Sequence, residues 1–458
     1  MRRFSLRDHV FRSAGQQLMH DLRAPRTAAA LGAAAGGWSA PRVRRSALPL
    51  VERAAVWLLG AGTAWTTATQ LRAGGVLGLG ELVLAGAIGL AALEVLARGS
   101  VAWTPLLGAT AAFWGTSFVL LVGGWVVGLW TDVWQLAAGR DLIALLLAAL
   151  VMLAFLQAPR LERRARAVTW VLLATLVPPI VALGVLTLTG RPQVGPVNAL
   201  YEELRFTGWA TNPNQIALAV VALPLLGLRL LPHVRGLRRA ALVTLLVGTL
   251  VVGAATFSDA LALAWAITAA LLGVLLWLRL LASRRSVAAR ALAALGVPLV
   301  VLAGAVAFGP TLVVVGERFA AASYREGGQG SDRLARWRNA LDAAETSPLV
   351  GLGPGAYSGP IAAFQGQEVH NTPLDWMLST GLLGLLAYAG LVAWVVAVCA
   401  AGRDSHAIVG VIALLVFTTF HYALRQPVFW MQLLLLAAPH AARRPADALR
   451  ASPRTVGR

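Results

Sequence analysis

The sequence predicts an all-α membrane protein whose helices cross the bilayer many times. Of its 458 residues, 58% are hydrophobic and only 13% are charged, and the mean hydropathy is +0.71. A soluble domain of this size has too little interior to bury that much apolar surface. The apolar residues also recur in runs of about twenty, the length of a helix that spans the hydrocarbon core.

Hydropathy divides the chain into about twelve candidate spans with polar links between them. The spans cover approximately residues 48–70, 76–97, 103–130, 141–157, 167–190, 212–232, 239–257, 258–282, 290–315, 373–400, 405–421 and 427–440. The chain is therefore organised as a tail at 1–47, a first block of spans at 48–315, a long outer loop at 316–372, a second block of spans at 373–440 and a second tail at 441–458.

The distribution of charge gives this map an orientation. The formal net charge is +19, with 39 basic residues, all of which are arginine. The arginines gather in alternate links, such as 160–166, 229–239 and 279–290. This positive-inside pattern places these links and both tails in the cytoplasm, so no nucleic-acid partner is needed to explain the charge. The basic N-terminal tail is expected to rest on anionic membrane lipid.

Two outer segments, 191–211 and 316–372, depart from the low charge expected outside. The external arginines are Arg191, Arg205, Arg318, Arg325, Arg333, Arg336, Arg338 and Arg425. Any one of them is equally compatible with an ordinary solvated charge. As a group they suit a phosphate ligand, because guanidinium stays charged and binds phosphate in a bidentate manner.

Residues 331–345 of the long outer loop have the pattern of an amphipathic helix. Ser331 is a candidate N-cap, and three apolar residues fall on one face at helical spacing, namely Leu334, Trp337 and Leu341. Arg333 and Arg336 lie three residues apart beside this stripe. We interpret the segment as a helix at the outer membrane–water boundary, the alternative being ordinary loop packing.

The GLGPG sequence at 351–355 follows this helix. Its glycines allow a tight turn and a close approach to a ligand. The segment lacks the preceding strand and the following lysine of a phosphate-binding loop, so it is only a weak indication of such a site.

A single histidine, His370, lies in an arginine-rich outer segment. Imidazole is the side chain best suited to accept a proton near neutral pH, although an isolated histidine is more often structural. The other histidines are His9, His20, His233, His406 and His440, which fall inside, and His421, which adjoins the last outer turn. Asn371 is expected to cap the helix that begins near Pro373, or to orient its neighbour.

Other polar groups are expected at the same outer ends. Arg205 precedes the Asn212-Pro213-Asn214 sequence at the start of the sixth span. Asn212 is a candidate N-cap, Pro213 suits the first helical turn, and Asn214 should face inward. Asp259 lies in the tight turn between the seventh and eighth spans.

Three sequence segments resemble a known family. GLGPGAY and VHNTPLDWMLSTGLLGLLAY are similar to the signature of the O-antigen ligase and polymerase superfamily of bacterial membrane glycosyltransferases. RFTGWATNPNQIALAVV is similar to its second motif, so the resemblance covers roughly residues 205–400. It implies an all-helical, C-type glycosyltransferase-like fold with the site in the long outer loop. It also implies transfer of a glycan from an undecaprenyl-diphosphate donor to a sugar hydroxyl, with inversion and without a metal or cofactor.

The resemblance assigns roles to individual residues. His370 matches the catalytic histidine, and Arg205 matches an arginine that holds the diphosphate. Asn212, Asn214 and Asn371 become supporting residues by their position beside these two.

One departure from the family concerns the turn between the seventh and eighth spans. The family often has Ser-Arg there, and this chain has Ser258-Asp259. An arginine of the long loop is expected to supply the missing cation, with Arg318, Arg333 and Arg336 as candidates. Asp259 is expected either to pair with an arginine or to orient the catalytic histidine.

Three functions were compared. A ligase passes the glycan to lipid A–core, and a polymerase passes it to another lipid-linked repeat; the motifs favour the ligase. A small-anion transporter is the third candidate, since Pro178-Pro179 could break a span, but most of the charge lies at the boundary and not at the midplane. The expected location is the bacterial inner membrane, with both termini cytoplasmic and the site on the outer, periplasmic side.

Overall fold

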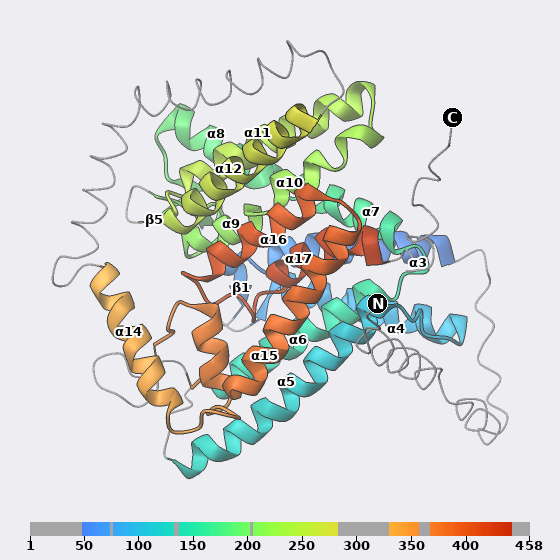
Figure 1. Ribbon diagram of the computed structural model, residues 1–458. Helices are drawn as coiled ribbons and strands as arrows, with labels where there is room; N and C mark the ends of the chain where they lie inside the picture. Colours follow the sequence, from blue (N-terminus) through green and yellow to red (C-terminus); the bar gives the residue numbers. More distant parts are fainter. Residues whose placement is uncertain are drawn as a thin grey trace, which may run out of the picture. The chain divides into compact units, whose positions relative to one another are not determined.

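The computed structural model describes residues 48–73, 77–131, 137–201, 205–282, 329–356 and 367–441, and within these the chain is an assembly of α-helices (Figure 1). The long helices are α3 (Leu48–Trp65), α4 (Leu79–Arg98), α5 (Pro105–Trp130), α6 (Ala138–Leu156), α7 (Leu161–Ala174), α8 (Val177–Thr189), α11 (Gly236–Ala255), α12 (Asp259–Ala282), α14 (Gln329–Ala344), α15 (Thr372–Ala401), α16 (Ser405–Thr418) and α17 (Pro427–Ala441). The shorter ones are α9 (Pro213–Val220), α10 (Leu223–Leu228), η1 (Thr69–Leu71) and η2 (Leu231–His233). The predicted all-α fold is confirmed.

Seven helical segments among the described residues are long and apolar enough to cross a membrane. They are 79–98, 105–130, 138–156, 161–189, 236–255, 259–279 and 372–401, and shorter apolar helices occupy 213–228, 405–418 and 427–441. The predicted span at 290–315, most of both tails and Arg318 lie outside the described residues. The total of about twelve spans therefore stays a prediction.

Helix starts follow the local sequence. Side-chain oxygens accept backbone N–H groups in the first turns of α5, α9, α15 and α16, from Thr104, Asn212, Asn371 and Asp404 respectively. These bonds satisfy N–H groups that have no partner inside a helix. The caps predicted at Asn212 and Asn371 are confirmed.

Helix α17 forms the centre of the packing. Nearly all of its residues are buried, and it contacts α3, α5, α6, α7, α9, α10, α15 and α16. An α-helix that is apolar on every side is expected in such a position. Its Trp430 ring lies 5.4 Å from Phe113 and 5.1 Å from Trp114, measured between centroids, and Trp376 adds a fourth ring.

Helix α15 is interrupted at Gly381, and residues of the GLGPG segment form hydrogen bonds with the backbone groups that the interruption leaves unpaired. Gly381 has φ of +67° inside the helix. The carbonyls that the break releases, those of Leu378 and Ser379, accept the N–H groups of Leu352 (2.8 Å) and Gly353 (3.0 Å). On the other side of the break, Leu382 donates to the Pro348 carbonyl at 2.8 Å. The segment thus fixes the direction of the first turns of α15.

The glycines of 351–355 serve this packing. Gly351, Gly353 and Gly355 all have positive φ. A Cβ at Gly351 would overlap the backbone of α15, one at Gly353 would overlap Trp125 of α5, and one at Gly355 would overlap Ala138 of α6. These glycines therefore allow the backbone of neighbouring helices to lie close to the segment. The structure shows close approach to other helices, and not the expected approach to a ligand.

Helix α14 lies beside α15 (Figure 1). It begins at Gln329, so Ser331 lies inside the first turn and the predicted cap is wrong. The helix buries Ala340, Ala343 and Ala344, whereas Leu334 and Leu341 remain 42% and 49% exposed. Of the predicted apolar stripe, Trp337 packs against the same cluster as these alanines, whereas the two leucines do not. Small alanines allow close contact with α15. The exposed leucines suit a helix at a membrane boundary.

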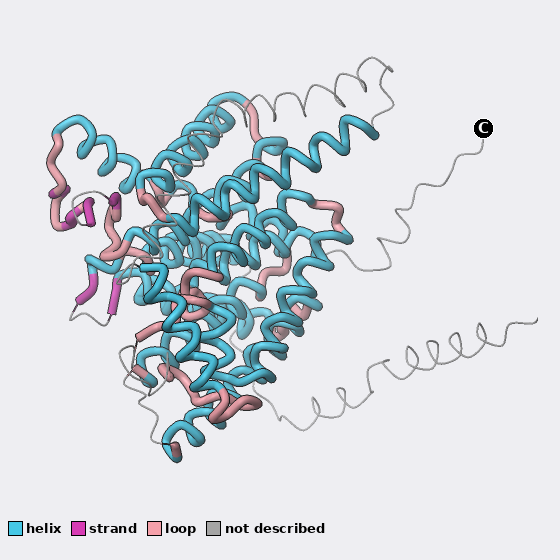
Figure 2. The backbone as a smooth tube through the Cα atoms, turned by 60° about the vertical axis from the view of Figure 1, so that its left-hand side comes forward, coloured by secondary structure: helices cyan, strands magenta, loops and turns pink. Residues whose placement is uncertain are grey.

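Three short antiparallel strand pairs lie at one end of the assembly. They are β1 (Arg72–Ala73) with β2 (Leu77–Gly78), β3 (Gln193–Val194) with β4 (Val197–Asn198), and β5 (Leu200–Tyr201) with β6 (Arg205–Phe206). Figure 2 shows the strands, in magenta, on the same side. Gln70 ties two of these regions together, since its side chain donates to the carbonyls of Asn198 (2.7 Å) and Ala210 (2.6 Å). Helices α9, α12, α15 and α17 also begin at this end, which we call the site end.

Candidate active site

His370 lies in a tight turn immediately before α15. Its φ is +56°, an unusual value for a residue with a Cβ. The buried carboxylate of Asp375 accepts the backbone N–H groups on both sides of it, from Val369 (3.2 Å) and Asn371 (3.3 Å). Asn371 in turn caps the helix through the Leu374 N–H at 3.1 Å. The strained turn is therefore held from within the first turn of α15.

A line of alternating charges supports the His370 ring. Nδ1 of His370 lies 3.6 Å from Oε2 of Glu368. The other Glu368 oxygen contacts the guanidinium of Arg425, which also donates to the buried carboxylate of Asp141 at 3.1 Å. Arg336 of α14 donates to the Glu368 carbonyl at 3.4 Å. A carboxylate beside one ring nitrogen leaves the other nitrogen available as a base.

Arginines of two separate elements, β6 and α14, act on each other electrostatically. Arg205 is held at the site end because Nε donates to the Thr256 carbonyl (3.0 Å) and Nη2 donates to Oδ1 of Asn214 (3.3 Å). Arg333 of α14 interacts electrostatically with Arg205. Burial lowers the pKa of Arg333, Asp259 raises it, and Arg336 and Arg205 lower it further, with a net downward shift. The group concentrates positive charge with one carboxylate, Asp259, beside it.

A second histidine shares this environment. The His421 ring lies 6.4 Å from the His370 ring, measured between centroids. Two histidines therefore lie in the arginine-rich region, and the prediction that His370 alone lies there is wrong. The sequence did contain an indication of this second histidine, because His421 ends a predicted span on the outer side.

Both histidines are neutral near pH 7. Burial, followed by Arg336 and Arg333, lowers the pKa of His370 to about 4. Burial, followed by Arg333, His370 and Arg205, lowers the pKa of His421 to about 3. A neutral imidazole keeps a lone pair that can accept a proton.

The predicted residues are thus brought together to different degrees. Arg333 and Arg336 act electrostatically on His370, and Arg205, which is bonded to Asn214, acts electrostatically on Arg333. Asp259 acts electrostatically on Arg333, and its predicted pairing with an arginine stays a prediction; the carboxylate beside the His370 ring is that of Glu368. Asn212 and Asn371 act as caps. Glu368, Asp375 and Asp141 were not anticipated; only Glu368, two residues before His370, was visible from the local sequence.

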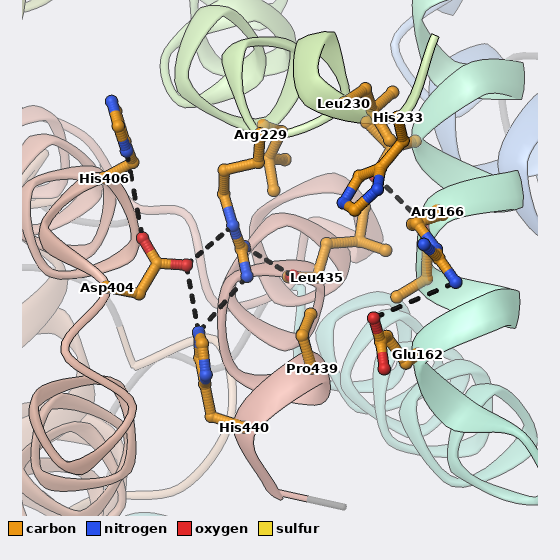
Figure 3. A pocket seen from close by; sticks show the side chains of 13 residues that line it. Glu162, Arg166, Arg229, Leu230, His233, Asp404, His406, Leu435, Pro439 and His440 are labelled. Atoms are coloured by element: carbon orange, nitrogen blue, oxygen red, sulfur yellow. Dashed lines mark hydrogen bonds and ion pairs between the residues drawn. The ribbon is translucent and has the colours of Figure 1, made fainter. Parts of the chain in front are cut away.

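A cavity of about 290 Å³ lies at the opposite end, where α16 begins and α10 and α17 end (Figure 3). Asp404 accepts from Nε of Arg229 (2.9 Å) and lies 3.0 Å from Nε2 of His440. It also caps the Ala407 N–H at 3.0 Å, and Arg229 donates to the Leu435 carbonyl at 3.1 Å. Because these charges are paired with one another, we interpret the cluster as a clamp that joins the ends of three helices.

The pKa of Asp404 reflects this clamp. Burial raises it, but the hydrogen bond from His440, the charge of Arg229 and the Ala407 N–H together lower it well below its usual range. The carboxylate is therefore charged at neutral pH and fully engaged. Among the described residues, no group of three or more His, Cys, Asp or Glu side chains is arranged to hold a metal ion.

Comparison with known families gives one match. Residues 244–389 match the family described as O-antigen ligase. Over these residues the chain is similar to the O-antigen ligase family. The resemblance drawn from the sequence motifs is thereby confirmed. No curated protein matches the chain.

The match has a defined relation to the site. It begins within α11 and ends within α15. It includes Asp259, Arg333, Arg336 and His370, and it leaves out Arg205, His421 and Arg425. The apolar helices and this match together indicate a multi-pass membrane protein that is similar to the O-antigen ligase family.

Proposed function

We propose that this O-antigen ligase-type protein transfers a glycan from an undecaprenyl-diphosphate-linked donor to a sugar hydroxyl. The observation that carries the proposal is a neutral imidazole, His370, beside guanidinium groups from α14. A proton acceptor next to fixed cations suits a reaction in which a hydroxyl attacks and a diphosphate leaves. We place the reaction on the outer face of the bacterial inner membrane, with both termini cytoplasmic, because of the arginine distribution.

The proposed step is a single displacement. The acceptor hydroxyl gives its proton to His370, and its oxygen forms a bond to the anomeric carbon from the face opposite the diphosphate. The bond between that carbon and the diphosphate oxygen breaks, and undecaprenyl diphosphate leaves with the electron pair. The configuration therefore inverts. His370 then releases its proton to solvent, and a base of this kind contributes about 10²- to 10⁴-fold.

The arginines have two roles in this scheme. Arg205 and Arg333 stabilise the charge that grows on the leaving diphosphate, where preorganised cations have the largest effect. Arg336 and Arg333 also disfavour protonation of His370 in the free protein. A bound diphosphate brings negative charge that offsets them, so donor binding is expected to make His370 a stronger base.

The carboxylate of Glu368 supports the histidine in this step. At 3.6 Å from Nδ1 it is too distant for a hydrogen bond in the free protein. Such bonds often tighten only when substrate is bound. Glu368 would then accept a hydrogen bond from Nδ1–H, and Nε2 would be free to act as the base.

Two acceptors distinguish the members of this family. We favour lipid A–core, the ligase acceptor; a second lipid-linked repeat, the polymerase acceptor, is the alternative. The purified protein should be incubated with an undecaprenyl-diphosphate-linked glycan and each acceptor separately, with and without EDTA. Capped core that persists in EDTA is the expected result, and lipid-linked ladders would assign a polymerase instead.

The same assay tests the reaction class. The anomeric configuration of the new bond should be opposite to that of the donor. Retention of configuration, or no transfer to either acceptor, would contradict the proposal. Anion flux in proteoliposomes without transfer would favour a transporter.

A further inference from the structure

His421 occupies a fixed position between the two helix ends that form the site. It lies in the link between α16 and α17, and its carbonyl accepts the hydroxyl of Thr372 at 2.6 Å. The same hydroxyl accepts the Ala423 N–H at 3.0 Å. Thr372 is the first residue of α15, two positions after His370. One threonine therefore fixes the position of the His421 turn relative to the His370 turn.

The plane of the His421 ring is also fixed. It stacks on Phe417 with centroids 4.7 Å apart and an interplanar angle of 29°. The residue is only partly buried. Within the part of the chain that the structure describes, no hydrogen bond reaches either ring nitrogen. A ring that is held this firmly, with both polar atoms unused, is ready to bind a ligand.

The charges around His421 indicate the class of ligand. Arg333 and Arg205 both act on its ring electrostatically, as does His370. A neutral imidazole has one N–H that donates and one nitrogen that accepts. An anion held between the two arginines would find this N–H beside it, and hydrogen bonds to charged groups are stronger than neutral ones.

We propose that His421 donates a hydrogen bond to the diphosphate of the lipid-linked donor, as a binding residue whose ring lies 6.4 Å from that of His370. The inference rests on the proposed function, since it takes the donor to be a polyprenyl diphosphate. His421 and His370 then have different roles in the reaction. His421 contacts the leaving group, and His370 contacts the attacking hydroxyl.

The test is direct binding of sugar-free undecaprenyl diphosphate to the full-length protein in nanodiscs of constant lipid composition. His421→Phe keeps the stacking and loses both nitrogens, and His421→Gln restores an N–H donor. His406→Phe, at the opposite end of the molecule, is the matched control. A hydrogen bond to a charged group is worth about 1.5–3 kcal/mol, so His421→Phe should weaken binding by about 10- to 100-fold. His421→Gln should recover part of this loss, and His406→Phe should bind as the wild type does.

Arg205→Ala separates the failure of this inference from failure of the proposed function. If Arg205→Ala weakens binding and His421→Phe does not, the role of His421 is overturned. If neither variant changes the affinity, both the inference and the diphosphate donor are contradicted. Thermal unfolding of each variant identifies any loss of folded protein, and the Gln variant then provides the decisive comparison.

Discussion

Asp375→Asn should slow glycan transfer strongly while the protein stays folded. The Asp375 carboxylate accepts two backbone N–H groups, at 3.2 and 3.3 Å, on either side of His370. The asparagine side chain has one acceptor oxygen, and its NH₂ group would face the second backbone N–H. That N–H would lose its partner next to a histidine whose φ is already unfavourable.

The size of the effect follows from this geometry. Asp375 is 2% exposed, so solvent cannot replace the lost bond. A buried N–H group that is left without a partner costs about 1–3 kcal/mol. If the turn then relaxes, the population that presents His370 correctly falls by about tenfold for each 1.4 kcal/mol. The turnover rate should therefore fall by about 10- to 100-fold.

The assay is the initial rate of transfer at saturating donor and acceptor, with thermal unfolding measured on the same preparations. Asp342→Asn is the matched control, because Asp342 is an exposed aspartate of α14. Its rate and melting temperature should equal those of the wild type. An Asp375→Asn protein that keeps more than half of the wild-type rate would refute the reasoning, as would a loss of rate that only follows a loss of folded protein.

Three further predictions concern other parts of the molecule. Gly381→Ala places a Cβ at φ of +67° against neighbouring backbone and should cost about 1–3 kcal/mol of stability. Gly390→Ala in the same helix meets open space and should not destabilise the protein, so equal melting temperatures of the two variants would contradict this prediction. Arg333→Lys should raise KM for the donor about tenfold with a smaller change in kcat, because an ammonium cannot replace a bidentate guanidinium; an unchanged KM would exclude Arg333 from donor binding. The neighbours of Asp404 lower its pKa, so the charged carboxylate stabilises the protein above about pH 4, and this stability is lost as the pH falls further. The melting temperatures of the wild type and Asp404→Asn should therefore differ at pH 7 and converge toward pH 2.

Much of the fold could be predicted because its signals are local. Hydropathy marked the runs that become α4, α5, α6, α11, α12 and α15 within a few residues. The caps at Asn212 and Asn371 depend only on the next three residues. His370 was found because its residue type and its position outside the spans both pointed to proton transfer.

The features that were missed depend on contacts between distant parts of the chain. The Arg425–Asp141 bond joins residues 284 positions apart, and no local pattern indicates it. The glycines of 351–355 were ambiguous because closeness to a ligand and closeness to another helix require the same freedom of φ. Only the pairing of Leu352 and Gly353 with the broken turn of α15 shows which applies.

The amphipathic pattern of α14 did not predict which face of the helix packs, for a related reason. Leucine and tryptophan dominate any apolar stripe read from sequence, yet Ala340, Ala343 and Ala344 form the packed face. Close contact between helices favours small side chains, particularly in membrane proteins. Trp337 packs with these alanines, whereas Leu334 and Leu341 are exposed, which suits the predicted position at the membrane boundary.

The central claim is that His370 is the base at a site that binds a diphosphate donor. The most direct measurement compares His370→Ala with the wild type in two assays, binding of sugar-free undecaprenyl diphosphate and transfer of the glycan. The donor affinity of His370→Ala should stay within about threefold of the wild type, and its rate of transfer should fall by about 10²- to 10⁴-fold. Transfer by His370→Ala at the wild-type rate would contradict it.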